Sequence, residues 1–282
     1  MSDTPLIWAS MTRTELAEAR DRKALVLVPT GSIEQHGDHL PVDTDVRLAT
    51  EMATRAAARM TDMPVVVAPS VPFGFAPHHL SLPGTISLRL ETYLALLGDM
   101  ARSIIGAGFG RVMFVNGHGG NSAPLRALAG QLITDGLPVG MVDYFAPSER
   151  DLPGYLHGTL PRPGHACEQE TALMLHVCPG AEAADIADRV QGLPPRDTQP
   201  WIAPGHEEDP ITAFGAGWAA IFQADDCGYF GDPGAATAKT GAEIAEITVD
   251  RLAAFLTAFA RTPLRLGVAS DPAAPQIAPP LV

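Results

Sequence analysis

The sequence has few cysteines, few basic residues and no long apolar run. Its three cysteines, Cys167, Cys178 and Cys227, are an odd number without CxxC spacing, which argues against a disulfide framework or a structural zinc knuckle. With 19 Lys and Arg against 32 Asp and Glu, the formal net charge of −13 disfavours binding to nucleic acid phosphates. No apolar run approaches the roughly eighteen residues that span a bilayer, and residues 1–5 lack the basic start of a signal peptide. We therefore expect a cytoplasmic protein with a small-molecule substrate and neither a nucleic acid nor a membrane partner.

What the sequence does contain is enough apolar material for a large core. Hydrophobic residues make up 46% of the 282 positions and charged residues 18%, a composition that excludes a disordered chain. This length admits one large domain or two small ones. We predict a single domain over residues 1–262, followed by a Pro- and Ala-rich tail over residues 263–282.

Strand-like and helix-like segments alternate along the chain. Short apolar runs predict buried strands at residues 24–28, 64–69, 111–115 and 138–144. Helical periodicity predicts helices at residues 11–22, 45–60, 90–105, 122–134 and 235–260, and one that begins near residue 170. Residues 193–217 are rich in Pro, Gly and charge, which indicates a long loop or lid. The alternation is typical of βαβ units, so we expect an α/β fold with a mainly parallel sheet and helices on both faces.

Polar side chains follow each of the first three predicted strands. Glu34 and His36 follow the first strand, His78 and His79 follow the second, and His118 follows the third. In sheets of this kind, ligands bind at the carboxyl ends of the strands. We therefore expect these side chains to converge on one site.

The stretch from residue 28 to residue 45 is dense in side chains that bind metals. Two histidines and four carboxylates fall within twelve positions: Glu34, His36, Asp38, His39, Asp43 and Asp45. A solvated loop would tolerate these charges, but a metal site better explains the mixture of imidazoles and carboxylates. Glu34 and His36 are two residues apart and point the same way on an extended segment. Asp45 begins the helix predicted for residues 45–60, where a carboxylate is favoured.

The predicted metal ligands are five residues from separate parts of the chain: Glu34, His36, Asp45, His118 and Glu170. Two imidazoles and three carboxylates suit one or two divalent ions such as Zn²⁺ or Mn²⁺. Two ions need a bridging ligand, and Asp45 is the candidate because a carboxylate bridges where an imidazole cannot. The two ions would polarise a substrate carbonyl and activate the water that attacks it. His165 lies five residues before Glu170. It is either the general acid for a leaving nitrogen or a residue that caps the helix or hydrogen-bonds to a metal ligand without contacting the metal.

Two other interpretations are open from the residues alone. The turn at residues 116–121 resembles a phosphate cradle at a helix start, although it lacks the Lys and the spacing of a Walker motif. Cys167 lies two residues from His165, so a Cys–His nucleophile is conceivable. That arrangement would leave the acidic cluster unexplained.

Four motifs together resemble the creatininase (creatinine amidohydrolase) family over roughly residues 24–255. They are Gly31-Ser32-Ile33-Glu34-Gln35-His36-Gly37 with His39-Leu40-Pro41 and Thr44-Asp45; Asn116-Gly117-His118-Gly119-Gly120-Asn121; His165-Ala166-Cys167-Glu168-Gln169-Glu170-Thr171; and Gly231-Asp232-Pro233 with Ala236-Thr237-Ala238. The resemblance implies a three-layer α/β/α fold, a binuclear divalent metal centre and a homohexamer. By motif position it implies the same five metal ligands and a catalytic role for His165.

The resemblance also implies a range of reactions. Family members mostly hydrolyse C–N bonds of cyclic or formyl amides, while others cleave a peptide during redox-cofactor maturation and some open an oxidised inositol ring. We predict a metal-dependent hydrolase in which a metal-activated water attacks the carbonyl of a small cyclic or formyl amide. The alternatives are ring opening of a cyclic ketone by C–C cleavage, or a catalytically silent small-molecule binding protein. The expected cofactors are two divalent ions per subunit, Zn²⁺ first and Mn²⁺ or Fe²⁺ as alternatives.

The chain departs from the family pattern at two places. The pattern follows the third-strand histidine with Tyr and a metal-binding Glu, whereas this chain has Gly119 and Gly120, which shifts the metal role to Glu170. The loop pattern Glu-His-x-x-Phe-Pro-Gly-Thr here begins with His78 and His79, and we expect this loop to face substrate. The predicted catalytic residues are His165 and Glu170, and the predicted substrate-binding residues are His39, His78, His79 and Asn116.

Overall fold

The computed structural model describes residues 6–160, 163–196 and 226–267, and a five-stranded sheet runs through this part of the chain. The strand order is β1-β3-β2-β4-β5, and every neighbouring pair is parallel. The strands are β1 (Leu6–Ile7), β2 (Leu25–Thr30), β3 (Val65–Val67), β4 (Arg111–Asn116) and β5 (Val139–Asp143). The mainly parallel sheet predicted from the sequence is therefore confirmed.

The central strands are apolar over most of their length because helices cover both faces of the sheet. Alternate side chains enter two separate cores. One core receives Leu25 and Leu27 of β2, and the other receives Val26 and Val28. An unbroken apolar run in the sequence thus corresponds to a strand that is buried on two sides.

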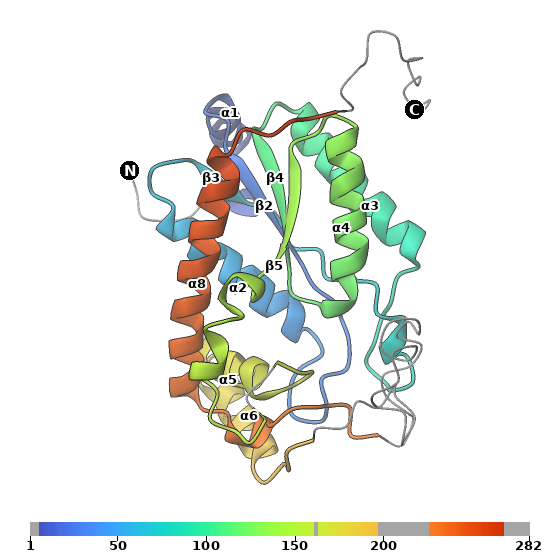
Figure 1. The fold of residues 1–282 in the computed structure, drawn as a ribbon, viewed down its shortest axis with the longest axis vertical. Helices are drawn as coiled ribbons and strands as arrows, with labels where there is room; N and C mark the ends of the chain where they lie inside the picture. The colour runs from blue at the N-terminus through green and yellow to red at the C-terminus, as the bar shows by residue number, and fades with distance from the viewer. Residues whose placement is uncertain (1–5, 161–162, 197–225, 268–282) are drawn as a thin grey trace.

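Figure 1 shows the three layers. Helices α2 (Thr44–Arg59) and α8 (Ala238–Arg261) lie on one side of the sheet, and α3 (Leu90–Gly106) and α4 (Gly119–Thr134) lie on the other. Helix α5 (Glu168–Val177) packs on α8 and α2 beyond the sheet, and α6 (Gly180–Val190) packs on α5. The α/β/α architecture is therefore confirmed.

Several elements differ from the sequence prediction. Strand β1 and helix α6 were not predicted, and β3 is shorter than the apolar run at residues 64–69. Helix α4 begins directly after His118, three residues earlier than predicted, and α1 (Arg13–Asp21) begins after a capping box made by Thr12 and Glu15. Short 3₁₀ turns make up the rest: Trp8–Ser10, Pro77–His79, Ala146–Ser148, Leu152–Gly154 and Pro233–Ala235.

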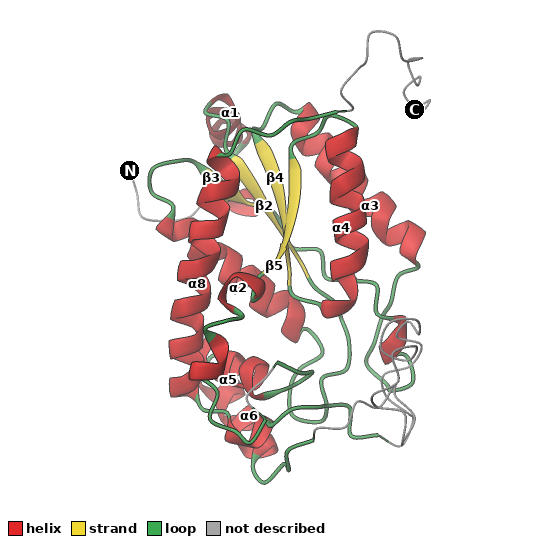
Figure 2. Cartoon of the chain, viewed as in Figure 1, coloured by secondary structure: helices red, strands yellow, loops and turns green. Residues whose placement is uncertain are grey.

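The loops that matter for function lie beyond the carboxyl ends of the strands (Figure 2). Of the predicted lid at residues 193–217, only 193–196 fall within the described residues, and of the predicted tail at 263–282 only 263–267 do. Within the described part of the chain, no helix is both long and apolar enough to cross a membrane.

Candidate metal centre

The five predicted metal ligands come from four loops and helix starts that meet at one edge of the sheet. The loop after β2 provides Glu34 and His36, and the loop after β4 provides His118. Asp45 and Glu170 lie in the first turns of α2 and α5, as predicted. Helical first turns hold a carboxylate rigidly and favour its negative charge, so both helices present fixed acidic groups to the loops.

The side chains form two groups that share Asp45. Glu34, Asp45 and His118 form the first group, in which His118 Nδ1 lies 2.9 Å from Glu34 Oε2 and 3.2 Å from Asp45 Oδ2. His36, Asp45 and Glu170 form the second, in which His36 Nε2 lies 3.2 Å from Asp45 Oδ1 and 4.0 Å from Glu170 Oε1. Each oxygen of Asp45 therefore faces a different group, which is the geometry that a bridging carboxylate requires.

Several of these atoms are buried without a well-directed hydrogen bond among the described residues. The atoms without such a hydrogen bond are Glu34 Oε2, His36 Nε2 and Asp45 Oδ2. They nevertheless lie within ion-pair distance of an imidazole nitrogen or a carboxylate oxygen of the cluster. Buried polar atoms normally have a hydrogen-bond partner, and unsatisfied ones call for an explanation. A nitrogen and carboxylate oxygens that converge in this way match the donor set of a borderline divalent cation. The residues present therefore fit a metal ion.

Backbone carbonyl groups orient both imidazoles. His36 Nδ1 lies 3.1 Å from the carbonyl oxygen of Glu34, and His118 Nε2 lies 3.2 Å from that of Phe75. A ring nitrogen must donate to a carbonyl, so the other nitrogen of each neutral ring carries the lone pair. That nitrogen points at the carboxylates. Metal-binding histidines typically have this arrangement, in which one ring nitrogen donates to a carbonyl group and the other faces the metal.

The electrostatics of the cluster are strongly coupled. Burial lowers the pKa of His36, but Asp45 and Glu170 outweigh it and raise the pKa to about 10. Burial likewise opposes the charge of His118, and Glu34 and Asp45 raise its pKa to about 10. Burial raises the pKa of Glu170 to about 7. The cluster thus holds protons at neutral pH that a cation would displace.

Close backbone contact brings the loop after β4 against the first turn of α2. A Cβ atom on Gly117 would overlap the carbonyl group of Asp45 and lie 3.1 Å from Ala49 Cβ. Only glycine therefore allows the turn after β4 to rest on the first turn of α2. This contact sets the spacing between His118 and Asp45.

His165, the predicted catalytic residue, lies at the same site. Its Nε2 is 2.8 Å from the carbonyl oxygen of Gln35, and its Nδ1 is 3.7 Å from Glu34 Oε1. Burial lowers the pKa of His165 well below its usual value, so the ring is neutral. Nε2 donates to the carbonyl group, which places the lone pair of the ring on Nδ1. The Cys–His alternative is not supported, because burial raises the pKa of Cys167 to about 12 and keeps the thiol protonated.

The four predicted substrate-binding residues fall into two classes. His78 and His79 line the cavity at the cluster. Asn116 does not, because its amide nitrogen donates to the His118 carbonyl group and to Asp143 while its oxygen accepts from Thr30. We infer that Asn116 holds the turn that carries His118.

His39 also lies behind the cluster rather than in the cavity. Its Nε2 is 3.0 Å from the carbonyl oxygen of Ala166 and 3.2 Å from Thr171 Oγ1. Ala166 has a positive φ of 48°, an unfavourable conformation for a residue with a side chain. We infer that His39 stabilises the turn between His165 and α5 instead of contacting substrate.

Two adjoining cavities lead to the cluster. The inner pocket has a volume of about 110 Å³ and is lined by Glu34, Asp45, His118, His165 and Glu170, among others. The second, which we call the outer cleft, has a volume of about 1110 Å³ and shares His78, Gly119, Gly120 and Phe145 with the inner pocket. The outer cleft therefore borders the inner pocket that holds the cluster.

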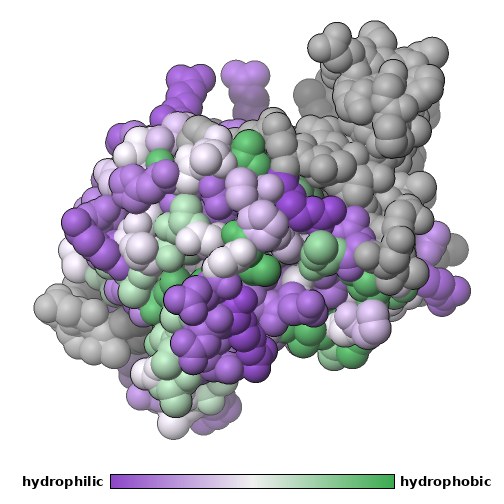
Figure 3. All heavy atoms as spheres, turned by 90° about the horizontal axis from the view of Figure 1, so that it is seen from below, coloured by the Kyte–Doolittle hydropathy of each residue, from purple (hydrophilic) through white to green (hydrophobic). Residues whose placement is uncertain are grey.

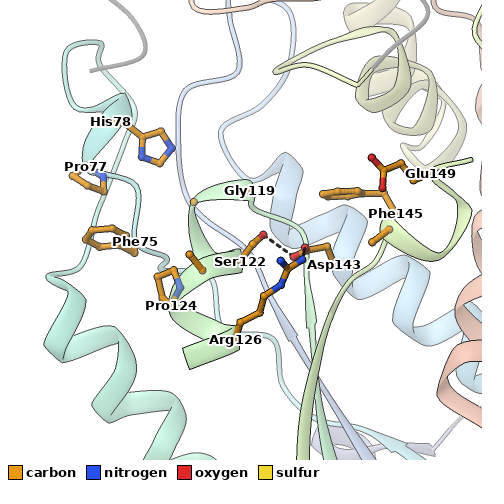
Figure 4. A pocket seen from close by; sticks show the side chains of 13 residues that line it. Phe75, Pro77, His78, Gly119, Ser122, Pro124, Arg126, Asp143, Phe145 and Glu149 are labelled. Atoms are coloured by element: carbon orange, nitrogen blue, oxygen red, sulfur yellow. Dashed lines mark hydrogen bonds and ion pairs between the residues drawn. The ribbon is translucent and has the colours of Figure 1, made fainter. Parts of the chain in front are cut away.

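Figure 4 shows the outer cleft with Phe75, Pro77 and His78 on one side and Phe145 and Glu149 on the other. Ser122, Arg126 and Asp143 lie between these two sides. Asp143 ends β5, accepts a hydrogen bond from Ser122 at 2.8 Å, and lies 3.7 Å from the guanidinium of Arg126.

Sequence reasoning missed Asp143 and Arg126, and it missed Gln35, which contacts two histidines of the site. Asp143 follows the fourth predicted strand, so the rule that identified the other strand-end residues would have found it. Arg126 and Gln35 carry no comparable signal, because one is a helix-surface arginine and the other an uncharged neighbour of two ligands.

Comparison with known proteins identifies relatives over most of the chain. The family model described as creatinine amidohydrolase matches residues 9–256. The mycofactocin precursor peptide peptidase of Mycobacterium tuberculosis (strain ATCC 25618 / H37Rv) is 32% identical over 232 residues, which cover 80% of this chain and 81% of that protein. The 3-dehydro-scyllo-inosose hydrolase of Thermotoga maritima is 30% identical over 41% of this chain and 37% of its own length. The creatinine amidohydrolase of Pseudomonas putida is 32% identical over 35% of this chain and 38% of its own length.

Solved structures show the same fold. The crystal structure of a candidate creatinine amidohydrolase from Bacteroides fragilis NCTC 9343 has a TM-score of 0.69 at 25% identity, covering 94% of this chain and all of that one. A creatininase with manganese and a Zn–Zn creatininase variant have TM-scores of 0.69 and 0.68 at 22% and 23% identity. Each covers 92% of this chain; the share of the solved chain is 100% for the manganese form and 99% for the Zn–Zn variant.

Proposed function

The chain belongs to the creatininase family of hydrolases, and on that premise we propose that it is a metal-dependent enzyme that hydrolyses an amide C–N bond in an extended substrate such as a peptide. The outer cleft carries this proposal. Its volume of about 1110 Å³ slightly exceeds the roughly 300–1,000 Å³ of sites for drug-sized ligands, and it shares four lining residues with the inner pocket at the ligand cluster. The long alignment with a peptide peptidase supports the same substrate class.

The proposed metal ligands are the five residues of the cluster, with Asp45 as the bridge if two ions bind. The two groups that share Asp45 support two sites per subunit. When bound, Zn²⁺ or Mn²⁺ would polarise the scissile carbonyl and lower the pKa of the attacking water. Zn²⁺ is our first choice and Mn²⁺ or Fe²⁺ the alternatives, because the mixed nitrogen and oxygen donors suit each.

The chain's own residues handle the proton. Water adds to the carbonyl carbon and gives a proton to His165 Nδ1, which carries the lone pair of the ring because Nε2 donates to the Gln35 carbonyl oxygen. The C–N bond then breaks, and His165 passes the proton to the departing nitrogen. Glu170, the other predicted catalytic residue, would act as a metal ligand in this scheme, because a bound cation would displace the proton that burial lets this carboxyl group hold. The products are a carboxylic acid and an amine.

Residues of the outer cleft would position the substrate. Phe75 and Phe145 offer apolar surfaces on opposite sides, and His78 stands where the cleft meets the inner pocket. Arg126 has a side chain that is 70% exposed and lies 3.7 Å from the carboxylate of Asp143. We assign it to the binding of an anionic substrate group, since a loosely held guanidinium pairs readily with a carboxylate.

A small cyclic or formyl amide is the second candidate substrate. The inner pocket of about 110 Å³ favours it, because that volume suits a small ring rather than a peptide. Ring opening of a cyclic ketone would use the same carbonyl chemistry but break a C–C bond. A binding protein without turnover is the remaining alternative.

A substrate panel tests these possibilities. The zinc- and manganese-loaded protein is incubated with short peptides, formyl and cyclic amides, and cyclic ketones, and the products are read by mass spectrometry. We expect cleavage of a peptide amide with release of a free amine. Exclusive turnover of small amides would replace the first proposal with the second, and turnover of no compound despite bound metal would favour the binding protein.

We also propose a homo-oligomer, with a hexamer as the expected state. Exposed apolar side chains on the loop between β3 and α3 support it, with Leu80 56% and Ile86 54% exposed. On the end of the molecule seen from below, hydrophilic and apolar patches alternate (Figure 3). Light scattering across a concentration series measures the state, and a monomer at all concentrations would contradict the proposal.

A further inference from the structure

Gln35 lies between Glu34 and His36 in the chain, and its side chain is buried against two histidines. The backbone N–H of Gly37 donates to Gln35 Oε1 over 3.0 Å. A backbone N–H can only donate, so this contact fixes which end of the amide is oxygen. The amide nitrogen of Gln35 therefore points to the other side, toward His79 Nδ1 and His165 Nε2, at 3.0 Å and 3.1 Å. His165 Nε2 must carry a proton to donate to the Gln35 carbonyl oxygen, so of these two nitrogens only His79 Nδ1 can accept from the amide.

The amide nitrogen fixes the tautomer of His79. Gln35 Nε2 lies 3.0 Å from His79 Nδ1. Because an amide nitrogen can only donate, His79 Nδ1 is the acceptor, and the proton of the neutral ring sits on Nε2. His79 Nε2 lies 3.4 Å from Glu34 Oε1, so the nitrogen that carries the proton is the one that lies near the carboxylate.

A threonine ties the same two residues together through the backbone. Thr85 Oγ1 accepts from the backbone N–H of Gln35 over 3.1 Å and donates to the carbonyl oxygen of His79 over 3.3 Å. The loop that carries His79 is thereby held in register with the segment that carries Glu34. The position of the His79 ring relative to Glu34 is thus fixed both by the Gln35 side chain and by the backbone contacts of Thr85.

From this geometry we infer that His79 is a positioning residue for Glu34 and that Gln35 sets the protonation of His79 for that role. His79 holds Oε1 of the carboxylate, which leaves Oε2, 2.9 Å from His118 Nδ1, as the oxygen that faces the metal group. This replaces the substrate-binding role predicted for His79. The inference rests on the proposed metal centre, because a fixed carboxylate matters most where it must meet a cation.

The tautomer is tested directly in the unmodified protein. The ¹⁵N chemical shifts of the histidine rings are measured in the zinc-loaded chain, with the His79 signal assigned by its loss in His79→Gln. We expect a neutral His79 with its proton on Nε2. A proton on Nδ1 would overturn the inference, because Gln35 would then not donate to that atom and Glu34 would not receive an N–H.

Variants test the consequence for the metal. Zinc affinity is measured by chelator competition for Gln35→Met, His79→Met and the double variant. We expect each single variant to bind zinc roughly 10- to 100-fold more weakly, the usual effect of removing a residue that orients a metal ligand. The double variant should bind zinc no more weakly than the weaker-binding single variant. Gln35 acts on Glu34 only through His79, so once His79 is replaced the loss of Gln35 has no further effect. Losses that multiply would overturn the series arrangement.

Two further variants separate this role from others. His79→Gln keeps an N–H donor at the end of the side chain, so zinc affinity should stay within roughly threefold of the unmodified protein. Gln131→Met, at an exposed position on α4, is the matched glutamine control and should change nothing. If His79→Gln instead weakened zinc binding as much as His79→Met does, an N–H donor would not be what Glu34 requires at this position and the inference would fail.

The outcome does not depend on whether the proposed reaction is correct. Zinc affinity and ring tautomers are measured without substrate, so an inactive protein with the expected affinities would refute the peptide hydrolase and leave this inference standing. Circular dichroism of each variant in the presence of chelator checks that it is folded. If His79→Met does not fold, the tautomer and His79→Gln decide the question.

Discussion

The ligand cluster and the outer cleft meet at the same residues, yet the chain constrains them very differently. Around the cluster, Asp45 sits in a helical first turn, and carbonyl groups orient His36 and His118. The cleft, by contrast, contains Arg126, whose side chain is 70% exposed and lies 3.7 Å from Asp143. One region is held by many buried contacts, and the other by few.

This difference suggests a division of tasks. Catalysis needs donors that stay in place while charge develops, which buried and hydrogen-bonded side chains provide. Substrate choice can vary with residues that the fold does not need, and exposed residues of the cleft are of that kind. Substitutions at the cluster should therefore remove metal and activity together, whereas substitutions in the cleft should alter only substrate binding.

The largest effect is expected for Asp45→Asn. Binding energies of about 10–16 kcal/mol over four ligands give about 3 kcal/mol per ligand, or roughly 100-fold in affinity. Because Asp45 belongs to both groups, its loss should weaken the binding of each of two ions by roughly 100-fold and abolish turnover. Elemental analysis and an activity assay measure this. Asp43→Asn, at the N-cap of the same helix, is the control; an active, metal-free Asp45→Asn protein would refute the metal centre.

The pH dependence of metal binding tests the cluster without any substitution. His36 and His118 have pKa values of about 10 and hold protons at pH 7, while Glu170, with a pKa of about 7, is half protonated. A cation must displace these protons, so affinity should rise with pH, by about 100-fold per unit for two protons and more steeply below pH 7. Competition titrations at pH 6, 7 and 8 measure the slope. A flat profile would mean that the imidazoles are not ligands.

Much of the cluster could be predicted from the sequence because its residues follow local rules. Glu34 and His118 come directly after buried strands, and parallel strands bring their carboxyl ends to one edge. Asp45 and Glu170 lie where helical periodicity begins, and the structure places both in first turns. Each placement depends on a few neighbouring residues and on the parallel order of the sheet.

The rest depends on contacts that span the chain. His39 was predicted to contact substrate. Its hydrogen-bond partner, the carbonyl group of Ala166, is 127 residues away in the chain, and no local sequence pattern predicts that pair. Gln35 meets His79 only because the loop after β3 folds back over the segment after β2. The cleft residue Arg126 is an ordinary helix-surface arginine until the fold shows that α4 borders a cavity.

A moderate effect is expected where the two regions touch, at Gly120. A Cβ atom there would overlap His118 Nε2 and lie 2.5 Å from His78 Cε1 and 2.7 Å from the Phe75 carbonyl oxygen. Gly120→Ala should therefore displace His118, lower kcat/KM by about 10-fold, and reduce the free energy of unfolding by about 1–3 kcal/mol. Kinetics and chemical denaturation measure both quantities.

Gly130 offers a matched control on the same helix, because a Cβ atom there would meet nothing within 4 Å. Gly130→Ala should leave kinetics unchanged and stabilise the protein by about 0.5–1 kcal/mol, as expected for alanine in a helix interior. Equal behaviour of the two variants would mean that the contact between His118 and the Phe75 carbonyl group is not needed.

The smallest effect is expected in the cleft itself, for Arg126→Gln. A solvent-exposed ion pair contributes about 0.2–1 kcal/mol, so KM for a substrate with a free carboxylate should rise by at most about fivefold while kcat and zinc affinity stay constant. The same substrate with an amidated end should show no change, which separates charge recognition from a general disturbance of the cleft. Arg102→Gln, on the exposed surface of α3 and paired with Asp135, is the matched control. If Arg126→Gln lowered kcat and zinc affinity as Asp45→Asn does, the cleft and the cluster would be one functional unit, and the division between them would not hold.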